Sequence, residues 1–133
     1  MPGVGRGINA TQLSSLAEYY GGIPFEVYKQ TNASESTYKL FPGGAPMKCR
    51  VLAMRGIMTG AGAAADTVAL QDGDGNVIIA AIAVDALADK DVFDASTIDD
   101  AYWDIDAGEE LNIVTVSGAL AFVTVKLVNV EDL

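Results

Sequence analysis

Short apolar or alternating segments, separated by turn-forming residues about every ten positions, make up most of the chain after residue 46. They are Met47–Met58, Asp66–Gln71, Val77–Val84, Leu111–Val116 and Leu120–Val130. Successive side chains of a strand point to opposite faces of a sheet, so alternation is typical of strands that bury one face. The pattern therefore predicts a mainly β fold, either an antiparallel β-sandwich or a barrel.

Two connections between these segments have the composition of tight turns. The sequence Asp72–Asn76 contains two Asp-Gly pairs, which supply the positive φ angles of a hairpin turn. Ser117 and Gly118 lie between the last two segments and predict a second hairpin there. The segment Val77–Val84 is continuously apolar, which predicts a strand buried on both faces.

The first 46 residues differ from the rest of the chain, because they hold half of the glycines and all four prolines. The residues with the spacing of one helical face are Leu13, Leu16, Ala17 and Tyr20. Gly21 follows them and predicts the end of a short helix. The sequence Pro24–Lys29 alternates as a strand does. We therefore predict that residues 1–46 form an extended N-terminal arm that carries a short helix and serves docking or subunit exchange. Residues 47–133 are predicted to form the sandwich or barrel domain.

Composition excludes most catalytic designs. The 133 residues contain no histidine, which removes Ser-His-Asp and Cys-His catalysis and every metal site that needs an imidazole. The single cysteine, Cys49, allows neither an intrachain disulfide nor a thiolate zinc cluster. We expect a protein that is not an enzyme and that binds no cofactor and no metal.

The formal net charge of −10 argues against nucleic acid as a partner, because phosphate binding depends on lysine and arginine. The charge is uneven along the chain. Residues 1–65 carry six basic and three acidic side chains, whereas residues 66–133 carry two basic and fifteen acidic ones. Such asymmetry suggests that the two parts meet different partners, although acidity that only keeps an apolar domain soluble explains it equally well. No apolar run approaches the ~20 residues of a membrane-spanning helix, and no signal peptide is visible, so we expect synthesis in the cytoplasm and no membrane partner.

Two acidic segments are candidate cation sites. Asp72, Asp74 and Asn76 have the opening spacing of a calcium loop, but the glycine and glutamate that such a loop requires later are absent. The sequence favours a hairpin turn there. The acidic stretch Asp99–Glu110 could hold a cation or a catalytic acid and base, and solvated loop charges are the competing interpretation that we prefer. Within that stretch, Tyr102 and Trp103 could stack on a sugar ring or anchor a core or an interface.

Several phrases of the sequence resemble small structural proteins of tailed bacteriophages, some of which are capsid decoration, or cement, proteins. The phrases are Ala45–Leu52, Arg55–Val68, Asp91–Asp94 and Ile98–Gly108. The resemblance covers roughly the C-terminal two-thirds of the chain and includes no catalytic signature. It implies a β-rich protein that binds the major capsid protein, associates with itself as a homotrimer and lies on the outer surface of the virion. There it would occupy three-fold and quasi-three-fold positions and stabilise the shell.

The decoration hypothesis assigns partner binding to apolar, aromatic and basic residues of the arm. These residues are Arg6, Leu13, Leu16, Tyr19, Tyr20, Phe25 and Tyr28. The alternative is a glycan-binding module of a tail or head fibre, in which Tyr102 and Trp103 form the stacking pair.

Overall fold

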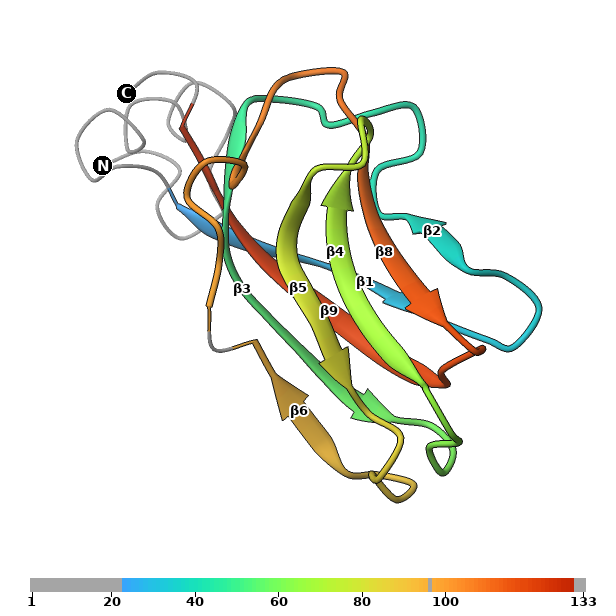
Figure 1. Cartoon of the computed structure of the whole chain (residues 1–133). Helices are drawn as coiled ribbons and strands as arrows, with labels where there is room; N and C mark the ends of the chain where they lie inside the picture. Colours follow the sequence, from blue (N-terminus) through green and yellow to red (C-terminus); the bar gives the residue numbers. More distant parts are fainter. Residues whose placement is uncertain (1–22, 96, 131–133) are drawn as a thin grey trace, which may run out of the picture.

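A computed structural model describes residues 23–95 and 97–130, and every regular element in this part of the chain is a strand (Figure 1). The nine strands are β1 (Pro24–Gln30), β2 (Thr37–Lys39), β3 (Cys49–Met58), β4 (Thr67–Asp72), β5 (Val77–Ala83), β6 (Val92–Asp94), β7 (Asp104–Ile105), β8 (Leu111–Val116) and β9 (Ala121–Asn129). The prediction of a mainly β fold is confirmed. The predicted helix around Leu13–Tyr20 lies outside the described residues.

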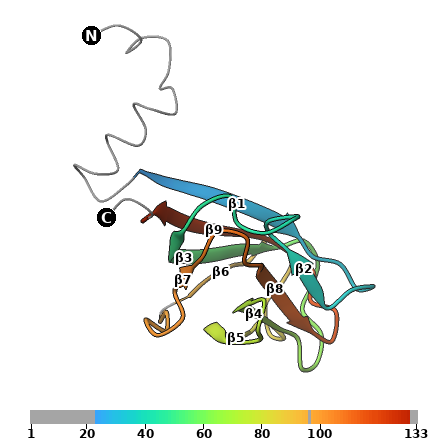
Figure 2. The same ribbon diagram turned by 90° about the horizontal axis from the view of Figure 1, so that it is seen from above.

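The strands form two antiparallel sheets that face each other across one core (Figure 2). Sheet A has the order β1-β9-β3-β6, and β7 also pairs with β3. Sheet B has the order β2-β8-β4-β5. The two sheets remain separate, so the arrangement is that of a sandwich rather than a closed barrel.

The core lies between the sheets because the strands alternate apolar and polar residues as the sequence indicated. In β9, the side chains of Ala121, Val123, Val125 and Leu127 are fully buried. Gly56 of β3 faces the core as well, and a Cβ atom there would lie 2.2 Å from Cζ of Phe93 on β6. The absence of a side chain at Gly56 therefore makes room for the Phe93 ring.

The connection between β8 and β9 corrects one sequence prediction. Ser117 and Gly118 form a turn with positive φ angles of 62° and 78°. The strands on either side do not pair as a hairpin, because β8 belongs to sheet B and β9 to sheet A. The turn carries the chain from sheet B to sheet A. The residue types of a turn do not show whether the strands on either side pair with each other or belong to different sheets.

The strand after Asp72–Asn76 confirms one prediction and corrects another. Strands β4 and β5 pair as the predicted hairpin. However, β5 is the outer strand of sheet B, and its Val77 side chain is 41% exposed. Two register shifts against β4 interrupt the alternation of its side chains. The continuous apolar run therefore belongs to an irregular edge strand and not to a strand buried on both faces.

Residues 24–46, which the sequence analysis assigned to the arm, contribute strands to both sheets. Strand β1 pairs with β9 along all seven of its residues, and β2 pairs with β8. Tyr38 of β2 is buried in the core, and its hydroxyl donates a hydrogen bond to the Asn32 carbonyl oxygen at 2.7 Å. The sheets therefore begin well before residue 47. The alternation over Pro24–Lys29 did predict β1 correctly.

Candidate interaction surface

The outward face of sheet A carries a row of exposed apolar side chains that crosses the whole sheet. Tyr28 on β1, Phe122 on β9, Ile57 on β3 and Val92 on β6 are 67%, 36%, 40% and 57% exposed. Phe122 is the register partner of Ile57, and Ile57 is the partner of Val92. The Tyr28 and Phe122 rings are stacked with their centroids 5.3 Å apart. We call these four residues the apolar row.

Strand alternation explains why these residues point outward. Val27, Val123 and Phe93, the chain neighbours of row residues, pack in or against the core. Each row residue therefore points to the opposite side of its strand. Exposed apolar side chains scattered singly need no explanation, but a contiguous row across four strands is typical of a binding surface.

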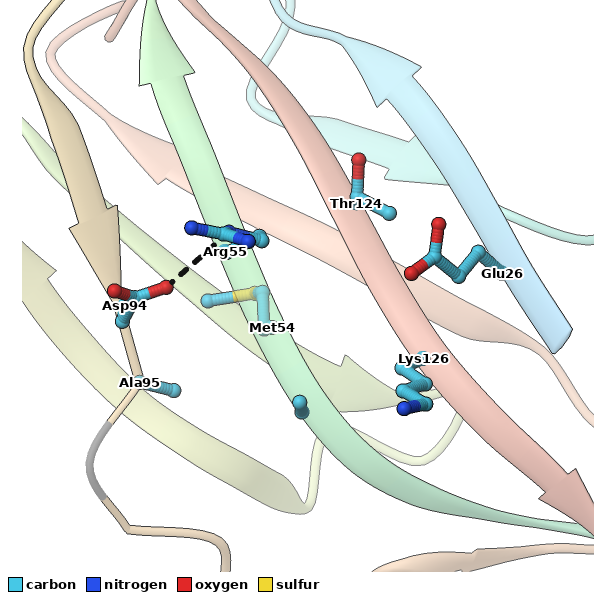
Figure 3. A pocket seen from close by; sticks show the side chains of 8 residues that line it. Glu26, Met54, Arg55, Asp94, Ala95, Thr124 and Lys126 are labelled. Carbon is cyan, nitrogen blue, oxygen red and sulfur yellow. Dashed lines mark ion pairs between the residues drawn. The ribbon is translucent and has the colours of Figure 1, made fainter. Parts of the chain in front are cut away.

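A groove with a volume of about 440 Å³ lies on the same face beside the apolar row (Figure 3). Its lining includes Glu26, Arg55, Asp94, Thr124 and Lys126. Glu26 and Lys126 are register partners, as are Arg55 and Asp94. Each of the two cations that line the groove therefore has a carboxylate residue as its register partner on the neighbouring strand.

The ion pair between Arg55 and Asp94 is open to solvent. Arg55 Nε lies 3.5 Å from Asp94 Oδ1, and both side chains are 67% exposed. Solvent-exposed pairs of this kind contribute about 0–1 kcal/mol to stability. The two charged groups are therefore available to a partner at small energetic cost.

A register shift in β3 shapes the groove next to that pair. The shift between Val51 and Ala53 leaves Leu52 and Ala53 both exposed, while Val51 and Met54 stay buried. The bulge interrupts the alternation of β3. It lies between the part of β3 that pairs with β7 and the part that pairs with β6.

Charge differs between the strands and the segments that connect them. The strands of sheet A carry four basic side chains (Lys29, Arg50, Arg55, Lys126) and three acidic ones (Glu26, Asp94, Asp104). The strands of sheet B carry one basic and one acidic side chain, and the other described residues carry two basic and eleven acidic ones. Both sheets are therefore close to neutral, and the acidity is concentrated in the segments between strands. The difference in charge between residues 1–65 and 66–133 does not coincide with a boundary in the fold.

Arg50 organises the region around Trp103. Its Nε and Nη2 atoms donate to the two carboxylate oxygens of Asp104 at 2.8 and 3.3 Å. The hydrogen bond that Arg50 donates to Asp104 raises the pKa of the Arg50 guanidinium above its ordinary value. The guanidinium carbon lies 4.7 Å from the centroid of the Trp103 ring, within range of a cation–π contact. Trp103 also packs against the core, so part of the ring surface that a sugar would need is occupied, whereas Tyr102 is exposed.

The carboxylates of Asp99–Glu110 make separate local contacts. Asp99 Oδ1 accepts a hydrogen bond from the Ala101 amide, and Glu109 Oε2 accepts one from the Asp106 amide, each at 2.9 Å. Glu110 Oε1 lies 2.7 Å from Lys39 Nζ, and that hydrogen bond lowers the pKa of Glu110. Within residues 23–95 and 97–130, no group of three or more His, Cys, Asp or Glu side chains is placed to hold a metal ion.

Asp72 organises the β4–β5 turn through its own oxygens. Oδ1 accepts hydrogen bonds from the Asp74 and Asn76 amides at 3.0 and 2.9 Å, and Oδ2 accepts one from Asn76 Nδ2 at 3.0 Å. The hairpin interpretation of Asp72–Asn76 is confirmed by these contacts.

The predicted partner-binding residues fall into three groups. Arg6, Leu13, Leu16, Tyr19 and Tyr20 lie outside the described residues. Phe25 turns inward and packs against the core, while Tyr28 belongs to the apolar row. The sequence analysis did not select Ile57, Val92 or Phe122 for the surface. Each of these residues alternates with buried residues of its own strand, which indicates that its side chain points outward. That pattern identifies a shared surface only when the neighbouring strands are known.

Comparison with known proteins gives little further information. No protein-family model matches the chain, and no curated protein matches it. Two solved structures, of the Gt and Gx strains of infectious bursal disease virus, are similar to 80% and 81% of the chain at 15% sequence identity, with TM-scores of 0.34 and 0.35. The chain spans 31% of the matched chain in each. Similarity at this level carries no argument about function. No helix among the described residues is long and apolar enough to cross a membrane.

Proposed function

We propose that the protein is a non-enzymatic capsid decoration protein of a tailed bacteriophage. The observation that supports this most is the uneven distribution of surface character. The outside of sheet A combines the apolar row with balanced charges, whereas the described segments between strands are strongly acidic. Such a molecule is suited to a fixed orientation within an assembly, with one face covered and the acidic part in solvent. An acidic outer layer also discourages particles from associating with each other.

The proposal gives the segment before β1 the contact with the major capsid protein. The candidate residues there are Arg6, Leu13, Leu16, Tyr19 and Tyr20. This segment enters sheet A at β1, the strand that carries Tyr28, so it is continuous with the proposed covered face. Three copies would associate at each three-fold or quasi-three-fold position on the outer surface of the virion, after synthesis in the host cytoplasm.

Stabilisation of the shell follows from mass action. A protein that binds the assembled lattice but not the dissociated subunits shifts the equilibrium toward the lattice. Many modest contacts on one particle add to each other, because every copy bridges neighbouring subunits. No catalytic step is required. The buried thiol of Cys49 and the absence of histidine from the sequence are in keeping with a purely structural role.

Co-sedimentation with purified capsids tests the proposal. The full chain should pellet with capsids in a saturable manner and raise the temperature at which they release their contents. A chain that lacks residues 1–22 should lose this binding, because it keeps every described strand and lacks only the proposed capsid contact.

A matched pair of variants makes the test specific. Leu13→Asp with Leu16→Asp alters the predicted apolar face and should weaken pelleting by about tenfold or more, equivalent to ~1.4 kcal/mol. Ser14→Asp with Ser15→Asp adds the same charges beside that face and should bind as the unaltered chain does. Failure of the full chain to pellet with capsids would refute the proposed function.

A further inference from the structure

We propose that copies of this chain associate through the outward face of sheet A, with the apolar row of each copy buried against the others. The inference rests on the proposed function in that decoration requires copies to meet, and it adds the surface through which they do so.

The apolar row gives the driving force. Phe122, Ile57 and Val92 are neighbours by strand register, Tyr28 stacks on Phe122, and all four side chains are at least one-third exposed. Removal of apolar surface from water stabilises an association by roughly 25 cal/mol per Å², and aromatic side chains such as Tyr28 and Phe122 dominate interfaces. The same row on a second copy is largely apolar too, so contact between rows buries apolar surface on both copies.

Charge selects the second copy as the partner for this face. The described segments between strands carry eleven acidic side chains, of which only Asp66 is buried, and two basic ones, so two copies repel each other there. The strands of sheet A carry four basic and three acidic side chains, so a second copy can approach their outward face without that repulsion. A near-neutral face with mixed charges offers both signs of charge to another copy, so identical subunits can approach each other through it.

The shape of the face allows the contact. Sheets pack face to face at about 10 Å when their side chains interdigitate. The groove of about 440 Å³ and a second hollow of about 150 Å³ beside Ile57, Val92 and Phe122 can receive side chains of another copy. Arg55 and Asp94 are paired only loosely at 3.5 Å, so each can also reach the opposite charge on a neighbouring copy.

The other exposed apolar element, the edge strand β5, is less suited to self-association. Its two register shifts bend the edge away from the straight geometry that strand addition needs. The Ile78 carbonyl oxygen already accepts a hydrogen bond from the Asp99 amide at 2.8 Å. Asp99 and Asp100, which line the hollow beside β5, would face their counterparts in a second copy.

Analytical ultracentrifugation of the full chain over a range of concentrations tests the inference. The unaltered protein should sediment as an oligomer, and its mass counts the copies. Ile57→Asp should raise the dissociation constant by about tenfold or more, equivalent to ~1.4 kcal/mol. Val116→Asp is the matched control, because Val116 is a 51% exposed residue of β8 in sheet B and the change adds the same charge. It should leave the mass unchanged.

A second variant guards against loss of folding in the first. Arg55→Glu alters only an exposed side chain and turns the balance of the face to net negative, so it should also dissociate the oligomer while circular dichroism stays that of the folded chain. A monomeric unaltered protein, or equal dissociation by Val116→Asp, would overturn the inference. A monomeric Ile57→Asp variant that still pellets with capsids would leave capsid binding intact, so the two proposals fail separately.

Discussion

Cys49 shows how the core controls a single ionisable side chain. It is the first residue of β3 and is fully buried. Burial, with a smaller contribution from the Asp104 charge, raises the pKa of its thiol from 9.0 to about 11. In the unfolded chain the thiol ionises near its ordinary pKa, whereas the folded chain keeps the proton.

We predict that this difference makes the protein less stable as the pH rises from 9 to 11. In that range the folded state binds more protons than the unfolded state, so the free energy of unfolding falls with increasing pH. Urea unfolding of the unaltered chain and of Cys49→Ala at about pH 8 and about pH 10.5 measures the effect. Other groups titrate equally in both proteins, so the gap between their stabilities should narrow at the higher pH. An equal gap at both pH values would contradict the prediction.

Residue-level inference from the sequence succeeded where local alternation sufficed. The alternation over Pro24–Lys29 predicted the strand that the structure shows as β1. It did not show that Phe25 faces the core, which depends on β1 pairing with a strand almost a hundred residues away. Ile57 and Phe122 are adjacent for the same non-local reason.

At the level of elements, the Asp72 turn was predictable because all its hydrogen bonds are local. Asp72→Ala should lower the free energy of unfolding by about 1–3 kcal/mol, because it leaves the Asp74 and Asn76 amides without their acceptor. Chemical denaturation measures the change. Asp74→Ala, in the same turn but exposed, is the control and should shift stability by about 0.5 kcal/mol or less. Equal effects of the two substitutions would show that the turn does not depend on the Asp72 side chain.

The β8–β9 connection was not predictable, although its residues are typical of a turn. A hairpin and a crossover between layers place the same demand on Ser117 and Gly118, namely positive φ angles. The difference arises because β9 pairs with β1 and β3 instead of with β8. The exposure of β5 was missed for a related reason, since an apolar run does not reveal whether a strand lies inside a sheet or at its edge.

For the whole molecule, the two sheets set the shortest chain that can fold. A chain of residues 23–133 should unfold cooperatively at nearly the temperature of the full chain, because all nine strands remain. A chain of residues 47–133 should fail to fold, because it lacks β1, β2 and the buried Tyr38. Thermal unfolding followed by circular dichroism separates the two. Cooperative unfolding of the shorter chain at the same temperature would show that residues 24–46 are dispensable.

The charge pattern changes meaning at this scale. Along the sequence it divides a basic first half from an acidic second half, which suggested an arm and a body. In three dimensions the acidity lies in the segments between strands, whereas Glu26, Arg50, Arg55 and Lys126 come from both halves and meet on sheet A. Composition therefore predicted that the surface is polarised, and only strand order shows where.

The central place of β9 in sheet A has a consequence for biosynthesis. Among the described strands, β9 is the last in the sequence, yet it lies between β1, the first of them, and β3. Until β9 has been synthesised, β1 has no partner strand in its sheet. Contacts between such distant parts of a chain form slowly. The apolar row, which needs β1, β9, β3 and β6 together, therefore forms only once β9 is available, so shorter nascent chains cannot associate through it.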